Sequence, residues 1–304
     1  MIGKVFISGA SSFISLNISK YFIKNGYEVY GFYRPNTKNL NNIKKIKGLN
    51  VMPFDFNNIS IDEIKKLKSN IEYKKIFDNE YVSYLDIAWD GQGKIGRDNY
   101  DIQMSNIDLS KKNLELAKLL NTKQFIFFGS QSEYSDTPHG IAKKEFAKYA
   151  EIESKKYDID FIHMKIFSVY GFGDRENSLI SQIMNSIIYK QDIYLGSCQK
   201  LWNYLYIDDL VKIIYYIVDN NIKTTQLDIG SDDTRKLKDF IVRIKQITNS
   251  DINMIFDKKE LHQDKFSLPD LTILKKIIKN INFTDFDTGI LNTYNSYLKN
   301  YENN

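Results

Sequence analysis

His139 and Lys143 are the two side chains of this sequence whose types and spacing best suit acid–base chemistry. They are four residues apart at the start of a segment with helical periodicity over 140–157, and side chains at i and i+4 are neighbours on a helix. Imidazole titrates near neutrality and is the commonest general acid or base in enzymes. A cationic lysine disfavours the protonated imidazole, so the pair suits a base better than an acid.

Two serines precede this pair at the end of a predicted strand. The run 124–128 is apolar enough for a buried strand, and Ser130 and Ser132 follow it closely. Ligands of open α/β sheets bind outside the carboxyl ends of the strands, where these hydroxyl groups are expected to lie. The alternative is structural, with serines that only terminate a strand.

A turn of small residues, SGASSFIS at 8–15, joins the first predicted strand to the first predicted helix. In dinucleotide-binding folds this turn is glycine-rich and holds the pyrophosphate at the helix N-terminus. Gly9 is retained for the tight turn, while Ser12 and Ser15 stand where two further glycines belong. The alternative is a serine-rich N-cap of an ordinary helix. The residues expected to bind a dinucleotide here are Gly9, Ser11, Ser12, Phe13 and Ile14.

The end of the second predicted strand, 27–34, indicates which dinucleotide is bound. A carboxylate at this point accepts hydrogen bonds from the ribose of NAD, whereas an arginine accommodates the extra phosphate of NADP. The sequence YGFYRPN has no acid, and Arg34 is placed for a bidentate phosphate contact. NADP is therefore the expected cofactor and NAD the alternative, while a solvated arginine at a strand end is the structural interpretation.

Strand-like apolar runs alternate with segments of helical periodicity through residues 1–166. Strands are expected at 4–8, 27–34, 49–56, 75–77, 84–88, 124–128 and 160–166, with a long helix over 100–120. This alternation predicts a Rossmann-type α/β domain, a doubly wound parallel sheet covered on both faces. Residues 167–304 mix helices with short strands and are expected to form mainly a smaller mixed α/β substrate lobe, from which some segments return to the sheet domain.

Composition argues against several classes of protein. The net charge is only +4, and no lysine or arginine block is interleaved with aromatics, which argues against nucleic-acid binding. With Cys198 as the only cysteine and three scattered histidines, neither a disulfide framework nor a metal site is expected. Neither a signal peptide nor an apolar run of membrane-spanning length is apparent, so a cytoplasmic protein without membrane contact is expected.

With these elements in place, the chain resembles the extended short-chain dehydrogenase/reductase family over nearly its full length. That family contains NAD(P)-dependent nucleotide-sugar epimerases, dehydratases and 4-keto reductases. The other segments that carry the resemblance are LDIAWDG (85–91), FFGSQSEY (127–134), KIFSVYGFGDREN (165–177), YLYIDDL (204–210) and LDIGSDDTRKLKDF (227–240). The resemblance implies a nucleotide-linked sugar as substrate and leaves a homodimer through a helix pair open. It also implies that Asp55, Phe56, Ala88, Trp89 and Asn106 lie beside the cofactor.

The catalytic residues are likewise implied by this resemblance. In the family a tyrosine passes a proton to or from the sugar oxygen, a lysine four residues later holds the cofactor ribose, and a serine orients the oxygen. Here Lys143 and Ser130 occupy the latter two positions, but His139 stands where the tyrosine belongs. Three interpretations stay open: His139 relays the proton, Tyr134 or a water does so, or the protein binds its ligands without turnover.

The substrate side also departs from the family pattern. Two arginines that grip the nucleotide pyrophosphate in relatives are replaced by Trp202 and by Leu261 or His262. Loss of both weakens pyrophosphate binding, while Trp202 offers stacking to a base or sugar and Ser132 a hydroxyl. The acidic pair that marks 4,6-dehydratases reads Gln131-Ser132, which disfavours a dehydratase.

The sequence therefore predicts an NADP-dependent nucleotide-sugar oxidoreductase of carbohydrate biosynthesis that acts at sugar C4, by 4-keto reduction or by epimerisation. Ser130, His139 and Lys143 are the expected catalytic residues. The alternative is a degenerate family member that binds cofactor or nucleotide sugar without turnover.

Overall fold

The structure is a computed structural model that describes residues 3–67, 82–258 and 267–302. The chain divides into two compact units. The first consists of Met1–Lys165 with Val211–Leu227, and the second of Ile166–Leu210 with Asp228–Asn304. The strand expected at 75–77 lies outside the described residues.

A seven-stranded sheet forms the centre of the first unit, with the strand order β10-β6-β5-β4-β1-β2-β3. Its strands are β1 (Lys4–Ile7), β2 (Glu28–Tyr33), β3 (Leu49–Pro53), β4 (Val82–Asp86), β5 (Gln124–Phe128), β6 (Asp160–Ile166) and β10 (Thr225–Ile229). The pairings from β3 through β6 are all parallel. The order reverses between β1 and β4, which is the switch point of a doubly wound sheet and the place where such folds bind ligands. The Rossmann-type fold predicted from the sequence is confirmed.

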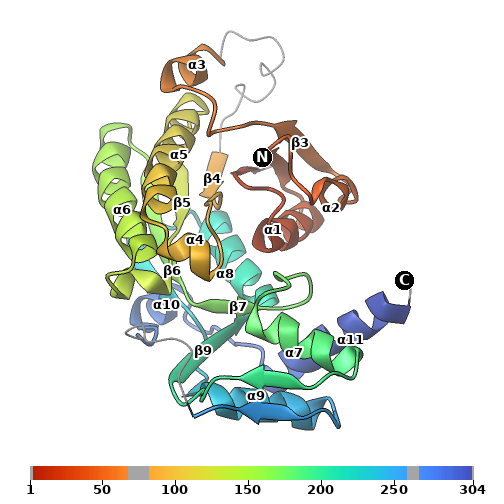
Figure 1. The fold of residues 1–304 in the computed structure, drawn as a ribbon. Helices are drawn as coiled ribbons and strands as arrows, with labels where there is room; N and C mark the ends of the chain where they lie inside the picture. The colour runs from red at the N-terminus through yellow and green to blue at the C-terminus, as the bar shows by residue number, and fades with distance from the viewer. Residues whose placement is uncertain (1–2, 68–81, 259–266, 303–304) are drawn as a thin grey trace. The chain divides into compact units, whose positions relative to one another are not determined.

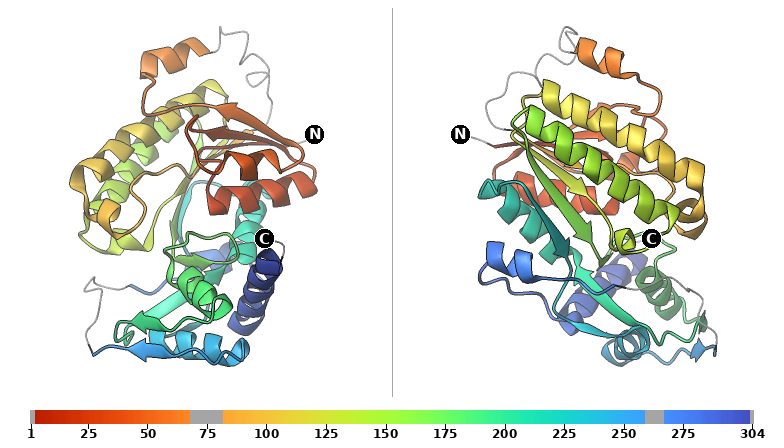
Figure 2. Two further views of the ribbon diagram at one scale, coloured as in Figure 1. Left: turned by 45° about the vertical axis from the view of Figure 1, so that its right-hand side comes forward. Right: turned by 90° about the vertical axis from the view of Figure 1, so that its left-hand side faces the viewer.

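Helices cover both faces of this sheet. They are α1 (Phe13–Lys24), α2 (Leu40–Lys44), α3 (Ile61–Lys66), α4 (Lys94–Asp98), α5 (Tyr100–Leu119), α6 (Pro138–Lys156) and α8 (Ile207–Asp219). Helices α5 and α6 lie side by side over one face, and α1 lies on the opposite face (Figures 1 and 2). Helix α1 ends at Lys24, shortly before Gly26, which adopts a left-handed conformation with φ +85°.

An in-register row of aromatic rings crosses the sheet beneath α5 and α6. Phe6 of β1 stacks on Tyr30 of β2 at 4.8 Å, and Tyr84 of β4 stacks on Phe125 of β5 at 5.6 Å. Phe125 in turn stacks on Phe161 of β6. Each such pair adds about 0.5–1.5 kcal/mol beyond its area burial, so the row stabilises the register that sets where the strands end.

Strand β4 ends two residues earlier than the sequence pattern predicted, at Asp86 rather than Ala88. The amides of Ile87 and Ala88 donate to the Ser8 hydroxyl, at 2.9 and 3.0 Å, instead of continuing a strand ladder. The loop after β4 therefore begins beside the glycine turn that follows β1.

The second unit has its own small sheets and core. Its strands are β7 (Ser168–Tyr170), β8 (Ile193–Leu195), β9 (Leu201–Tyr206), β11 (Thr234–Lys236) and β12 (Met254–Phe256). Its further helices are α7 (Leu179–Ile188), α9 (Leu237–Ile247), α10 (Thr272–Ile277) and α11 (Phe286–Glu302). The strand orders are β11-β9-β7 and β12-β8, and Tyr170, Tyr204, Phe240 and Phe286 lie at the centre of the core.

Two observations on the described residues concern membranes and metals. No helix among them combines the length and apolar character that crossing a bilayer requires. Within the same part of the chain, no group of three or more His, Cys, Asp or Glu side chains is arranged to hold a metal ion.

Candidate active site

The turn after β1 needs glycine at one position and accommodates serines at the others. Gly9 has φ +65°, and a Cβ there would lie 3.0 Å from the Ala88 Cα. Ser12, the N-cap of α1, has φ −76°, which any residue adopts. Its Oγ accepts from the Ser15 amide at 3.1 Å and lies 2.7 Å from the Ser15 Oγ. The two serines that stand in place of glycines therefore form a hydrogen bond with each other through their hydroxyl groups.

This turn fits the diphosphate of a dinucleotide. Phe13 and Ile14 occupy the first turn of α1, where backbone N–H groups have no acceptor within the helix. Such amides, with the helix dipole behind them, attract anions. The absence of a Cβ at Gly9 lets the turn lie against the backbone of Ala88, and the carbonyl of Ser11 accepts from the Asn39 side chain at 3.1 Å.

Arg34, directly after β2, is paired with an acid that the sequence analysis did not single out. Its guanidinium Nη1 lies 2.7 Å from Asp90 Oδ1, and half of its side chain is exposed. Asn57 donates to the other Asp90 oxygen at 3.1 Å. One contact uses few of the five N–H donors of an arginine, so Arg34 keeps donors for a phosphate. A carboxylate nevertheless stands beside it, supplied by the loop after β4 and not by β2.

Three of the residues expected beside the cofactor brace this region through their own contacts. Asn106 on α5 donates to the Asp90 carbonyl and accepts from the Asp90 amide at 2.7 Å, which fixes the loop after β4. The Asp55 carboxylate closes a turn by accepting from the Asn57 amide. The Phe56 ring is 5% exposed and packs against other phenylalanines.

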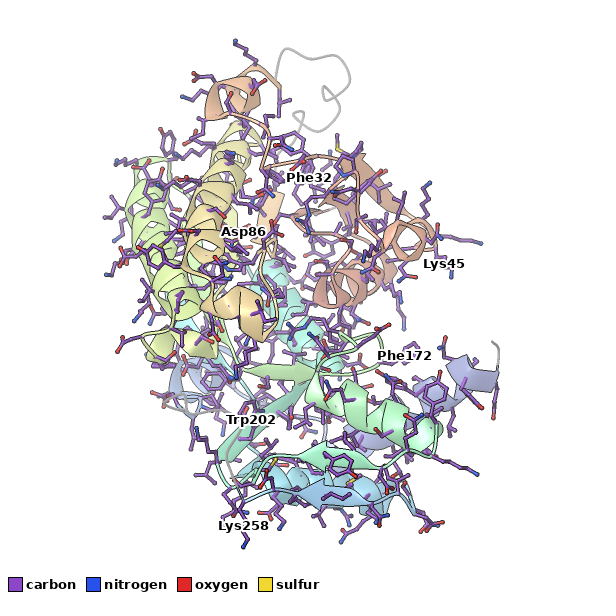
Figure 3. All side chains as sticks on the ribbon, viewed as in Figure 1. Phe32, Lys45, Asp86, Phe172, Trp202 and Lys258 are labelled. Atoms are coloured by element: carbon purple, nitrogen blue, oxygen red, sulfur yellow. The ribbon has the colours of Figure 1, made fainter. Side chains whose placement is uncertain are left out.

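Lys143 and Asp86 are both buried at the centre of the site, and each affects the ionisation of the other. Lys143 is 4% and Asp86 1% exposed, and Asp86 lies at the carboxyl end of β4 (Figure 3). Burial raises the pKa of Asp86, an effect that the charge of Lys143 opposes. Burial likewise lowers the pKa of Lys143, opposed by the charges of Asp86 and Glu133. Each group therefore depends on the other to remain ionised inside the protein.

The Lys143 ammonium already has three protein contacts, one of which is the Phe127 ring at 4.7 Å. Its Nζ donates to the Phe128 carbonyl at 2.6 Å and lies 3.6 Å over the Trp89 ring. An ammonium has three donors, so a ribose hydroxyl would share the group with these neighbours. Lys143 therefore fits the nicotinamide ribose if the ribose hydroxyl shares the ammonium with these protein contacts.

His139 lies in the first turn of α6 with its ring 2% exposed. The helix begins at this point because the Thr137 hydroxyl accepts from the Gly140 amide and Pro138 occupies the first helical position. The His139 Nδ1 lies 2.8 Å from the Gln103 Oε1, and its ring meets Trp89 edge-on at 6.0 Å. His139 and Lys143 thus lie one turn apart on α6, as the sequence predicted, and both contact Trp89.

Ser130 follows β5 and caps a short 3₁₀ helix at Gln131–Tyr134. Its Oγ accepts from the Ser132 amide, and its own amide donates to Glu133 Oε1 at 2.8 Å. Glu133 is buried and pairs with the buried His163 of β6 at 3.0 Å. This carboxylate–imidazole pair holds the backbone of the serine turn in place.

Tyr134 and Trp202 each have ring contacts of their own. The Tyr134 ring is 41% exposed and lies under the Lys165 ammonium at 4.5 Å. Trp202 belongs to the second unit, half-buried on β9 with its ring 6.2 Å from that of Tyr204 (Figure 3). Leu261 and His262 lie outside the described residues.

The second unit holds a cavity of about 380 Å³ whose lining is acidic. It includes Asp232, Asp233, Asp285, Asp287 and Arg235. Arg235 and Asp233 are paired with each other, so the lining carries a net negative charge and is a poor environment for a diphosphate.

Asp86, Gln103 and Asp90 were not among the site residues predicted from the sequence. Asp86 could have been recognised from the sequence, because a carboxylate rarely ends a buried strand at the ligand-binding edge of a sheet. Gln103 lies one turn before Asn106 on the same helix face, which was the available signal for it. No sequence pattern marked Asp90, because only the folded loop brings it to Arg34.

Comparison with known proteins agrees with this architecture. Residues 5–230 match the sequence model of the family described as the NAD dependent epimerase/dehydratase family. CDP-abequose synthase of Salmonella typhimurium is 24% identical over 300 residues, which cover 94% of this chain and 95% of that protein. Protein CapI of Staphylococcus aureus is 24% identical over 237 residues, 71% of this chain and 69% of that protein.

Solved structures share the fold at low sequence identity. UDP-glucose 4-epimerase of Thermotoga maritima superposes with a TM-score of 0.83 at 17% identity, covering 98% of this chain and 99% of that one. UDP-N-acetylglucosamine 4-epimerase of Methanobrevibacter ruminantium gives 0.83 at 19% identity, covering 99% and 100%. The family resemblance inferred from the sequence motifs is confirmed, and with it the expectation of an enzyme. Because the family match spans most of its length, the chain belongs to the NAD dependent epimerase/dehydratase family.

Proposed function

We propose that this protein is an NADP-dependent oxidoreductase that acts at C4 of a nucleotide-linked sugar, by 4-keto reduction or by epimerisation. The observation that carries the proposal is the placement of His139 and Lys143 one turn apart on α6, beside Trp89 of the loop after β4. The glycine turn with its anion-binding helix end supports a dinucleotide at the same sheet edge.

The chain's own residues then have separate tasks. When bound, the cofactor supplies or accepts a hydride at its nicotinamide ring. Ser130 orients the sugar oxygen, His139 gives it a proton or takes one from it, and Lys143 holds the nicotinamide ribose. Gly9 and the segment 11–14 hold the diphosphate, and Arg34 the 2′-phosphate.

A nucleotide-linked sugar is supported by the names of the related proteins. CDP-abequose synthase and the UDP-sugar 4-epimerases are named for sugars linked to a nucleoside diphosphate. CDP-linked sugars are the first to test, because CDP-abequose synthase aligns with 94% of this chain. Trp202 is the proposed stacking partner for the base or sugar, and Ser132 a proposed hydrogen-bonding partner. The Gln131-Ser132 pair argues against 4,6-dehydration.

A cytoplasmic homodimer is part of the proposal. Helices α5 and α6 lie side by side, and Tyr100 and Ile152 on them are each about 60% exposed. Light scattering of the purified protein tests the homodimer.

The test of the function is binding followed by turnover. NADPH and NADH are titrated into the purified protein, and nucleotide-linked 4-keto sugars are then added, CDP-linked first. Consumption of NADPH identifies a reductase. Conversion of a 4-hydroxy sugar without net consumption identifies an epimerase. Cofactor binding without either outcome favours the alternative of a non-catalytic binding protein. Absence of cofactor binding contradicts the oxidoreductase and leaves only a protein that binds the nucleotide sugar.

Replacing Arg34 with alanine is expected to weaken NADPH binding by about 10- to 100-fold and to leave NADH binding within about threefold. A charge-assisted contact is worth about 1.5–3 kcal/mol, and only NADPH has the phosphate that makes it. Fluorescence titration of both cofactors measures the change. Lys38→Ala, an exposed lysine in the same segment, controls for the loss of a positive charge. Equal weakening of both cofactors by Arg34→Ala would remove the case for NADP.

Replacing Asp90 with asparagine is expected to strengthen NADPH binding severalfold. The change removes a negative charge 2.7 Å from the Arg34 guanidinium and keeps an amide in place of the carboxylate. The ratio of NADPH to NADH affinity, measured at low and high salt, is the readout. A ratio that moves toward NADH would show that Asp90 supports phosphate binding instead of opposing it.

A further inference from the structure

Gln103 is a fully buried polar side chain that connects the loop after β4 to the proposed proton relay. Its Nε2 lies within hydrogen-bonding distance of three carbonyl oxygens, those of Asp90 at 3.3 Å, Gly91 at 3.3 Å and Gly96 at 2.8 Å. An amide nitrogen donates to carbonyls, whereas an amide oxygen in this place would repel all three. These contacts assign the orientation of the Gln103 amide.

The Gln103 Oε1 consequently has to be an acceptor, and it has two neighbours. The Trp89 Nε1 lies 2.8 Å from it and can only donate. The His139 Nδ1 also lies 2.8 Å from it. A flipped amide would set its NH₂ group against the indole N–H, so the contact with Trp89 independently gives the same orientation.

We infer that Gln103 is a positioning residue that holds His139 in the tautomer protonated at Nδ1. The oxygen has no hydrogen to give, so the imidazole nitrogen facing it must carry one. A neutral His139 then carries its lone pair on Nε2, and that nitrogen is the atom that exchanges the proton. The catalytic consequence rests on the function proposed above.

The proton transfer follows from this assignment. As a base, the Nε2 lone pair takes the proton of a sugar hydroxyl, so that an O–H bond breaks, an N–H bond forms and the ring becomes an imidazolium. As an acid, the imidazolium returns the Nε2 proton to the sugar oxygen. Nδ1–H remains bonded to Gln103 in both states, so the ring need not turn over between the two steps.

The test is the tautomer of His139 in the purified protein, read from ¹⁵N chemical shifts of the imidazole nitrogens at about pH 8.5, above the ordinary pKa of the ring. The chain has three histidines, so His139→Gln assigns the signals. The wild-type ring is expected to show a protonated Nδ1 and an unprotonated Nε2. An Nε2–H tautomer, or shifts averaged between both forms, would overturn the inference.

Two variants identify Gln103 as the cause. Gln103→Met, of similar volume, is expected to shift His139 toward the Nε2–H form or a mixture. Trp89→Phe removes the other donor to Oε1 and is expected to leave the tautomer unchanged. His163, whose ring contacts Glu133 and Gln226, is the internal control and should not respond to either variant. An unchanged His139 tautomer in folded Gln103→Met would contradict the role of Gln103, while the wild-type spectrum tests the assignment even where a variant fails to fold.

Kinetics separate this inference from the proposed function. Gln103→Met is expected to lower kcat about tenfold with KM changed less than twofold, because the nitrogen that exchanges the proton is no longer fixed. Turnover by the wild type with a mixed His139 tautomer would refute the positioning inference alone. The Nδ1–H tautomer in a protein that turns over no nucleotide-linked sugar would refute the proposed function alone.

Discussion

Replacing His139 with glutamine is expected to lower kcat by about 10²- to 10⁴-fold, the loss that follows removal of a positioned general acid or base. Glutamine supplies an amide N–H for the contact with Gln103 but has no group that titrates near neutrality. The NADPH affinity is expected to change by less than about threefold, because His139 is on α6 whereas the proposed diphosphate turn lies between β1 and α1. Steady-state kinetics on the sugar that turns over fastest and NADPH titration measure the two effects.

The companion variant, His139→Tyr, restores the residue type found in the family at this position. It is not expected to raise activity, because the ring is 2% exposed and is enclosed by Gln103 and Trp89. Extra volume in a packed site costs about 1–3 kcal/mol. A tyrosine variant faster than the wild type would show that the site still suits a phenol. A near-wild-type kcat in His139→Gln would show that another group transfers the proton. Tyr134 would then be the first residue to substitute.

Replacing Asp86 with alanine is expected to destabilise the protein by about 3–5 kcal/mol, since it leaves Lys143 buried without the opposite charge that compensates it. The Ser8 hydroxyl, which donates to Asp86 at 3.0 Å, also loses its acceptor. Thermal denaturation should show a fall in Tm on the order of 10 °C. Asp108→Ala is the matched control, because this exposed aspartate is paired with Lys111 and should cost no more than about 1 kcal/mol.

A double variant separates charge from packing. Asp86→Leu with Lys143→Met replaces both buried groups by apolar side chains and is expected to recover most of the stability lost in Asp86→Ala. The double variant is expected to be inactive, because it lacks the lysine. Equal instability of the single and double variants would show that the two residues are not coupled. The loss would then come from the cavity and the Ser8 hydroxyl.

Local sequence patterns predicted the elements of the fold well. The strands at 124–128 and 160–166 match the structure residue for residue, because both segments are rich in phenylalanine and isoleucine, which favour strands. The register of His139 and Lys143 was also predictable, since helical spacing alone makes them neighbours. Strand β4 was misplaced by two residues, because the hydroxyl of Ser8, directly after the neighbouring strand β1, accepts the amides that would have continued its ladder.

The contacts that define the chemistry were not predictable in the same way. Gln103 is 36 residues from His139 along the chain, and Asp90 comes from a loop far from Arg34. Lys143 was expected to hold a ribose, and no sequence pattern indicated that its ammonium also contacts Phe128 and Trp89. Such pairings depend on how the helices pack on the sheet. The periodicity of apolar residues along the sequence does not predict this packing.

Transfer of deuterium from NADPH labelled at the nicotinamide C4 to the C4 of a nucleotide-linked 4-keto sugar tests the proposed function most directly. This half-reaction is common to reduction and epimerisation, so it does not depend on which of the two the enzyme performs. With the wild type we expect deuterium bound at sugar C4, detected by mass spectrometry and NMR, and at least about 10²-fold less label per unit time with His139→Gln. Bound NADPH without label in any sugar, CDP-linked or UDP-linked, would contradict an oxidoreductase acting at C4.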